Sequence, residues 1–325
     1  MDWSAVLANL QNPPILFFLL GLLTPLLRCQ LEIPAPVTKL IALYLLWAIG
    51  FKGGVELSRG GLDAEAWLTL LAAMLLATAT PLWVFAIARR RFGVHDAAAL
   101  AATYGSVSAV TFLTACASLD RQGIAFGGHM VAAMALMESP AIVIAVLLRR
   151  RSLARQGVQA PMSLWPLLHD ALFSGPVVLL LGSLAIGAIC GERGYQTMKP
   201  LCTDLFQGVL VFFLLDLGVM AGGRLAQLRQ NARFLVPFGI VLPLLHAALA
   251  LGLARLLGLT PGDGFLLAVL AASASYIAVP AAMRLAVPES EPSIYVASAL
   301  GITFPWNIVF GLPLIQYAAT ALLHT

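Results

Sequence analysis

Long apolar runs, separated by short polar stretches, dominate the chain. Ten of these runs approach the roughly 20 apolar residues that a membrane-spanning helix needs. They cover residues 13–27, 36–57, 66–88, 97–119, 127–148, 166–190, 203–222, 234–257, 263–287 and 293–320. The runs are continuous and rich in Leu and Ala, whereas the strands of a membrane barrel would alternate with a period of two. The pattern therefore predicts an all-α membrane protein with ten transmembrane helices.

Composition supports a lipid environment. Of the 325 residues, 60% are hydrophobic and 10% are charged, whereas soluble proteins average about 25% charged residues. So few charges argue against a soluble enzyme and against a secreted disulfide scaffold. The net charge of +4 comes from short basic clusters between apolar runs, so we expect no nucleic-acid partner. Catalytic motifs such as HExxH, GxSxG and the P-loop are missing from the sequence, which predicts a non-enzyme.

Basic residues indicate the orientation in the membrane. If the N-terminus lies outside, most Lys and Arg residues fall on the inside, as they do in cytoplasmic loops. The inside clusters lie at residues 28–39, 89–91, 149–155, 224–233 and 284. We therefore expect both termini outside and the polar stretch 151–165 in the cytoplasm, where it links a first half (1–150) to a second half (166–325).

The two halves of the chain resemble each other. Three features recur at a nearly constant offset: a Gly-x-x-x-Gly pair, a Ser-x-Ser pair and a proline. They are Gly50 and Gly54 with Gly218 and Gly222, Ser106 and Ser108 with Ser273 and Ser275, and Pro140 with Pro305. Each half has five spans, an odd number, so the second copy enters the membrane upside down. Such inverted repeats are typical of secondary transporters, whereas the glycine pairs indicate close helix packing.

Spans 97–119 and 263–287 carry helix breakers beside small hydroxyl residues. Gly105 and Pro280 weaken the helix at these places, and we expect both helices to be broken near the midplane. Two half-helix N-termini could then face one pocket and favour a small anion. The candidate substrate-binding residues are Gly105, Ser106, Val107, Ser108, Ser273, Ala274 and Ser275. The alternative is that these small residues only allow close packing of helices.

Glu138 is a carboxylate in the middle of a span, where it costs on the order of 2.5–3.5 kcal/mol. A bound cation is the preferred compensation, and a proton or a buried Arg or Lys partner are alternatives. Hydroxyl, amide and carboxylate oxygens suit a hard cation such as Na⁺. The candidate Na⁺ ligands are Ser108, Thr111, Glu138, Ser275, Thr303 and Asn307.

Three further charges lie within spans. Lys52 and Glu56 are four residues apart, so we expect them to pair on one helix face. Asp216 has no obvious partner in the sequence.

At these residues the sequence resembles the sodium-dependent bicarbonate transporter family of bacteria and cyanobacteria. The resemblance covers nearly the whole chain. It is densest in residues 105–111 (GSVSAVT), 135–141 (ALMESPA), 271–275 (AASAS) and 288–307. The chain departs from the cyanobacterial pattern at Ala109-Val110, at Tyr276 and at Glu138, and its central linker is shorter.

The resemblance implies an inverted five-plus-five helix fold, with a core domain and a gate domain each drawn from both repeats. It implies that bicarbonate and Na⁺ bind between the two broken helices. It also implies a homotrimer in the bacterial inner membrane, inhibited by a PII-like protein that binds the cytoplasmic face.

Taken together, these features predict a secondary active transporter that imports a small anion, most simply bicarbonate, by Na⁺ symport with alternating access. The main alternative is a proton-coupled carrier of a small organic acid, with Glu138 as the proton site. A passive anion pore and a sensor that binds the anion without moving it are further alternatives.

Overall fold

The computed structural model describes residues 11–29, 31, 33–61, 63–157, 169 and 173–323, which form helices and loops only. The helices before the central linker are α2 (Pro13–Leu26), α3 (Ala35–Gly60), α4 (Ala64–Ala88), α5 (Val94–Gly105), α6 (Ala109–Gln122), α7 (His129–Glu138) and α8 (Pro140–Ala154). Those after it are α10 (Gly175–Lys199), α11 (Leu205–Arg224), α12 (Ala232–Leu257), α13 (Pro261–Ala272), α14 (Ala278–Ala286), α15 (Pro292–Ser298), α16 (Phe304–Trp306) and α17 (Leu312–Leu323).

Several helices begin where the sequence supplies a cap. The Asp63 carboxylate accepts a hydrogen bond from the Ala66 amide at 2.8 Å and starts α4. The Thr260 hydroxyl accepts one from the Asp263 amide at 3.2 Å and starts α13. Such caps satisfy amides that have no partner within the helix, so the polar residues between apolar runs set the helix starts.

By length and composition, seven helical stretches of the described chain can cross a membrane. Two apolar helices, Pro13–Leu26 and Pro261–Ala272, are shorter. The sixth expected span, 166–190, differs from the structure, in which α10 begins at Gly175. Residues 166–168 and 170–172 lie outside the described part of the chain, as do residues 158–165 of the predicted linker.

The stretch Gly175–Leu228 is too long for one crossing. Gly191 divides it, because its φ of 55° and ψ of −151° lie outside the helical region. Glycine adopts a positive φ without the steric penalty of a side chain. The chain therefore turns at Gly191, within α10. A short π-helical turn, Pro200–Asp204, then joins α10 to α11.

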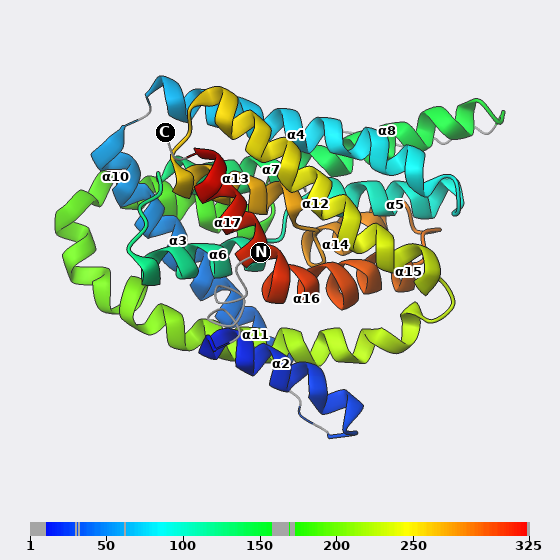
Figure 1. The fold of residues 1–325 in the computed structure, drawn as a ribbon, viewed down its shortest axis with the longest axis horizontal. Coiled ribbons are helices and arrows are strands. Elements are labelled where there is room, and N and C mark those ends of the chain that lie inside the picture. Colours follow the sequence, from blue (N-terminus) through cyan, green and yellow to red (C-terminus); the bar gives the residue numbers. More distant parts are fainter. Residues whose placement is uncertain are drawn as a thin grey trace.

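Four helices, α2, α3, α10 and α11, form what we call the four-helix group. Helix α2 lies along α11 at one edge of the molecule (Figure 1), and α3 packs along α10. A side chain at Gly54 would contact the Leu184 carbonyl oxygen, and one at Gly218 would contact the Phe18 carbonyl oxygen. The Gly-x-x-x-Gly pairs are thus packing positions within the fold.

The remaining helices form the main group, in which α5 and α13 are central. Nearly every residue of both helices is buried. Helix α5 is rich in alanine, with residues 97–102 buried on all sides, and small side chains let neighbouring backbones approach closely. Helix α5 packs against α4 and α8, and α13 packs against α12 and α17.

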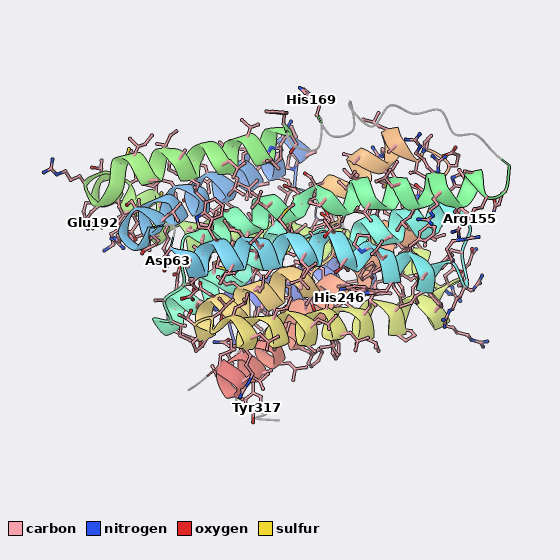
Figure 2. The ribbon with its side chains drawn as sticks, turned by 90° about the horizontal axis from the view of Figure 1, so that it is seen from above. Asp63, Arg155, His169, Glu192, His246 and Tyr317 are labelled. Atoms are coloured by element: carbon pink, nitrogen blue, oxygen red, sulfur yellow. The ribbon has the colours of Figure 1, made fainter. Side chains whose placement is uncertain are left out.

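Charged side chains gather at the two ends of the helices. Figure 2 places Asp63 and Glu192 at one end and Arg155 at the other, with His246 between them. The His246 ring is buried and accepts a hydrogen bond from the Trp83 indole nitrogen at 2.9 Å. The middle of the bundle is therefore largely uncharged, and the exceptions lie around one cavity.

Candidate functional site

The first break separates α5 from α6. Helix α5 ends at Gly105, and Ser106 has an extended backbone with φ −91° and ψ 173°. A side chain at Gly105 would collide with Pro81 and Ala141. Gly105 is thus required for close approach to neighbouring helices, a role that the sequence analysis did not assign to it.

Ser108 starts the second half of this broken helix. Its hydroxyl accepts hydrogen bonds from the Thr111 amide at 3.2 Å and from the Thr111 hydroxyl at 3.0 Å. This is the geometry of an N-cap. The predicted residues Ser108 and Thr111 therefore lie together at the N-terminus of α6.

The second break covers residues 273–277, between α13 and α14. Ser273 is extended, with φ −84° and ψ 167°, and the Ser275 hydroxyl accepts a hydrogen bond from the Val279 amide at 3.4 Å. Pro280 is the third residue of α14 rather than part of the break. Its missing N–H falls in the first turn, where no helical hydrogen bond is lost.

The two breaks contact each other. The Ser108 amide donates to the Ser273 hydroxyl at 2.8 Å, and the Ser275 amide donates to the Thr103 carbonyl oxygen at 2.9 Å. The expectation of two interrupted helices that meet is confirmed for these segments. Each break supplies partners for the backbone groups that the other one frees, so the irregular backbone is satisfied by protein.

A cavity of about 1490 Å³ lies between the four-helix group and the main group. Its wall includes the first turn of α6, with Ala109 and Val110, and the first turn of α14, with Ala278. The first amides of a helix have no partner within it and carry a positive partial charge. The cavity therefore receives two helix N-termini, which is the arrangement that suits a small anion.

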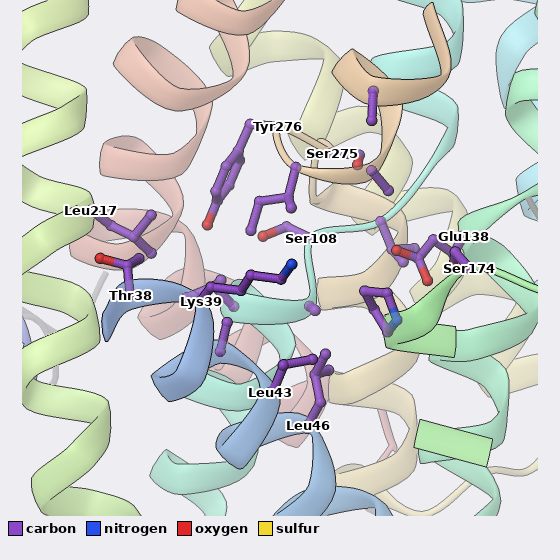
Figure 3. Close-up of a pocket in the computed structure, with 18 of the residues that line it drawn as sticks. Thr38, Lys39, Leu43, Leu46, Ser108, Glu138, Ser174, Leu217, Ser275 and Tyr276 are labelled. Carbon is purple, nitrogen blue, oxygen red and sulfur yellow. The ribbon is translucent and has the colours of Figure 1, made fainter. Parts of the chain in front are cut away.

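The rest of the wall is mostly apolar. Figure 3 shows the cavity from close by, with polar and charged side chains on opposing elements. The polar and charged residues that line the cavity are Thr38, Lys39, Ser108, Glu138, Ser139, Ser174, Asp216, Ser275 and Tyr276. Val107 also lines the cavity, whereas Gly105, Ser106, Ser273 and Ala274 are buried behind it.

Glu138 is the last residue of α7, directly before a kink at Ser139 and Pro140. Its backbone carbonyl accepts a hydrogen bond from the Ser106 hydroxyl at 2.7 Å, and its half-buried side chain lines the cavity. Among the described residues, no Arg or Lys pairs with this carboxylate. The alternative of a buried ion pair is thus not observed there.

The predicted Na⁺ ligands fall into two sets. Ser108, Glu138 and Ser275 line the cavity, whereas Thr111, Thr303 and Asn307 do not. The Thr303 hydroxyl donates to the Gly239 carbonyl oxygen at 2.8 Å. The Asn307 side-chain amide donates to the Ala272 carbonyl oxygen at 2.9 Å. Asn307 thereby satisfies a backbone group that the end of α13 leaves free.

Sequence reasoning missed one side of the site, the wall formed by the four-helix group. The Thr38 hydroxyl donates to the Asp216 carboxylate at 2.9 Å, and both residues line the cavity together with Lys39. Asp216 had no partner in the sequence analysis, and Lys39 was counted with the inside loop. The spacing of Lys39, Leu43 and Leu46 on one helix face was the available signal.

Beyond the cavity, further along α3 from Lys39, the two groups contact each other. The Lys52 amino group pairs with the Asp120 carboxylate at 2.6 Å, so the expected Lys52–Glu56 pair is wrong. Glu56 pairs instead with Arg59 at 2.5 Å. Lys52 faces α6 across the group boundary, and a partly buried contact of this kind outweighs the few tenths of a kcal/mol of an i,i+4 pair.

Two further hydrogen bonds join the groups in the same region. The Arg121 guanidinium donates to the Asn12 side-chain oxygen at 2.5 Å, and the Gln207 side-chain amide donates to the Ala117 carbonyl oxygen at 3.3 Å. Both join the main group to elements of, or next to, the four-helix group. These contacts hold the two groups together at the end of α3 that lies away from Lys39.

The chain belongs to the Na⁺-dependent bicarbonate transporter superfamily, whose family model matches residues 13–320. The match includes both breaks, Glu138 and the wall of the four-helix group. No curated protein matches the chain. Family membership indicates a membrane transporter, and the superfamily is named for Na⁺-dependent transport of bicarbonate.

Proposed function

We propose that this member of the superfamily imports bicarbonate by Na⁺ symport with alternating access. The observation that carries the proposal is the meeting of two helix N-termini, those of α6 and α14, at one cavity. Backbone amides and the Ser108 hydroxyl offer donors to an oxyanion, and the dipoles add a favourable charge. Secondary transporters use discontinuous helices for the same purpose.

Na⁺ supplies the energy and the charge balance in this proposal. The Glu138 carboxylate carries a negative charge beside the anion pocket and has no basic partner among the described residues. Na⁺ binds first, with oxygens of Glu138, Ser108 and Ser275, and cancels that charge. Thr111, Thr303 and Asn307 hold the broken backbone in place around the ion. The anion then meets a pocket that attracts it.

The internal symmetry of the chain supports the alternating motion. Each half contributes two helices to the four-helix group, α2 and α3 from the first and α10 and α11 from the second. Each half also contributes one broken helix, and the breaks contact reciprocally. We infer two inverted repeats of five spans, with the four-helix group as the gate domain and the main group as the core domain.

The position of the cavity supports an inward-open state. Lys39, Asp216 and Met220 line it near the basic cluster that follows α11, and basic clusters mark the cytoplasmic side. With both termini outside a bacterial inner membrane, the cavity opens inward and the Lys52–Asp120 end is the closed outer gate. The proposal also includes the homotrimer and the PII-like cytoplasmic regulator that the resemblance implies.

The test is uptake of labelled bicarbonate by proteoliposomes in an inward Na⁺ gradient. We expect uptake that is lost when K⁺ replaces Na⁺ and is strongly reduced by Glu138→Gln. Equal uptake in K⁺ would refute Na⁺ coupling. Uptake of an organic acid that follows a pH gradient and ignores Na⁺ would favour the proton-coupled alternative, in which Glu138 carries the proton.

A further inference from the structure

Lys39 brings a positive charge into the cavity from the four-helix group. It lies in the second turn of α3 and shares a helix face with Leu43 and Leu46, which also line the cavity. Figure 3 shows its side chain extending from α3 across the cavity toward the segment that carries Ser108. The ammonium group thus faces the break from the opposite wall.

Lys39 lies beside a polar pair that also lines the cavity. Its neighbour Thr38 is hydrogen-bonded to Asp216 at 2.9 Å. Asp216 precedes Arg224, the last residue of α11, by eight residues, which corresponds to about 12 Å along a helix. Lys39, in the second turn of α3, lies beside this pair and is itself exposed. Ionisable side chains that line a cavity between membrane-spanning helices mark functional pathways.

Lys39 has no ion-pair partner in the part of the chain that the structure describes. Lys52, further along the same helix, is paired with Asp120. Asp216 is engaged by Thr38 rather than by Lys39. Glu138 lies on the opposite wall of the cavity. The charge of Lys39 is thus available to a group within the cavity.

A second polar group points to a ligand at the same place. The Tyr276 side chain is 7% exposed and lines the cavity, and its hydroxyl faces Ser108 (Figure 3). That hydroxyl makes no hydrogen bond of good geometry within the described residues. A buried hydroxyl without a partner is costly, so an oxyanion that accepts from it removes the cost.

We infer that Lys39 recognises the charge of the transported anion from the four-helix group, opposite the helix N-termini of the main group. The inference rests on the proposed function and adds the residue that determines charge selectivity. A small monovalent oxyanion bridges the Lys39 ammonium on one wall and the α6 amides, Ser108 and Tyr276 on the other. A neutral solute makes no charge–charge interaction with Lys39, so the site binds the anion in preference to it.

The first test compares Lys39→Gln, Lys39→Arg and the control Lys199→Gln in bicarbonate uptake. Lys199 lies at the exposed end of α10, outside the cavity. We expect Lys39→Gln to raise the KM for bicarbonate on the order of tenfold or more, the value of one charged hydrogen bond. Half-saturation by Na⁺ should change less than twofold. Lys39→Arg should retain most of the affinity. An unchanged KM in Lys39→Gln overturns the inference.

The second test restores the charge chemically and does not depend on Na⁺-driven transport. Lys39→Cys is prepared with Cys29→Ser and Cys190→Ser, because those two thiols are exposed whereas Cys116 and Cys202 are buried. An aminoethyl thiosulfonate reagent should restore bicarbonate binding, and a sulfonatoethyl reagent should not. Folding failure would prevent restoration by both, so recovery by the cationic reagent alone also shows a folded protein.

Protection by substrate separates this inference from the proposed function. Bicarbonate should slow labelling of the thiol introduced by Lys39→Cys at least several-fold, and chloride should not. Protection without Na⁺-driven uptake would support the role of Lys39 while refuting symport. Equal labelling rates with and without bicarbonate, in a protein that takes up bicarbonate, would overturn the role of Lys39 and leave symport standing.

Discussion

The Lys52–Asp120 pair allows a quantitative test of the two-group description. The pair joins α3 of the four-helix group to α6 of the main group at 2.6 Å, with side chains that are 15% and 30% exposed. If the groups move against each other, this contact breaks whenever the closed end opens. Asp120→Asn removes the charge with little change in volume.

The magnitude follows from distance and burial. At an effective dielectric constant of about 20, the Coulomb attraction is about 6 kcal/mol. Loss of hydration and of side-chain freedom offsets most of it, so we take a net contribution of about 1–2 kcal/mol. Loss of the pair should therefore raise the ratio of molecules with this end open to molecules with it closed by about 5- to 30-fold.

Cys116 reports the opening. It is 0% exposed and lies one turn before Asp120 on α6. With Cys29→Ser and Cys190→Ser, the labelling rate of Cys116 by a membrane-impermeant thiol reagent should rise about 5- to 30-fold in Asp120→Asn, in line with the population shift. The control is Arg59→Gln, because Arg59 pairs with Glu56 and Glu192 within the four-helix group.

The charge-swapped double variant, Lys52→Asp with Asp120→Lys, should return the labelling rate toward that of the wild type. Labelling that stays at the wild-type rate in Asp120→Asn would refute the reasoning, because the pair would then contribute nothing to closure. Equal acceleration by Arg59→Gln would mean that general loosening, rather than opening of this end, exposes the thiol.

Three other predictions concern the packing around the breaks. Ser108→Ala removes the α6 cap and should lower stability by about 1 kcal/mol while reducing bicarbonate affinity, as thermal unfolding and binding would measure; unchanged binding would remove Ser108 from the pocket. Asn307→Leu leaves the Ala272 carbonyl without its donor and should cost about 1–3 kcal/mol; a melting temperature equal to that of the wild type would contradict this. Gly54→Val should destabilise by about 1–3 kcal/mol through contact with Leu184, whereas Gly182→Val, with open space around it, should be tolerated in the same assay.

The breaks were predictable from sequence because their signals are local. Ser106 and Ser108 follow Gly105, and Ser273 and Ser275 follow an apolar run of α13. Small hydroxyl residues compete with helical hydrogen bonds and cap the next helix. Repetition of the same pattern in both halves distinguished it from chance. Glu138 was equally predictable, because a carboxylate inside an apolar run is energetically costly and therefore indicates a function.

Residues that act across the fold were not predictable. Whether Lys52 meets Glu56 or Asp120 depends on which helix α3 faces, and α6 is distant in sequence. Lys39 lies near the start of an apolar run, so the pattern alone could not separate a loop position from a cavity wall, and the partner of Asp216 is distant in sequence. The role of Gly105 likewise depends on Pro81 and Ala141, which approach it only in the folded protein.

The most direct test of the central claim is equilibrium binding of bicarbonate to the purified protein, with Na⁺ or K⁺ as the only cation. The claim is that anion and cation share one site at the crossing of the two broken helices. Binding free energies are reciprocal, so Na⁺ should increase bicarbonate affinity by the same factor as bicarbonate increases Na⁺ affinity, and Glu138→Gln should abolish the coupling. Bicarbonate affinity that is the same in Na⁺ and in K⁺ would contradict the account.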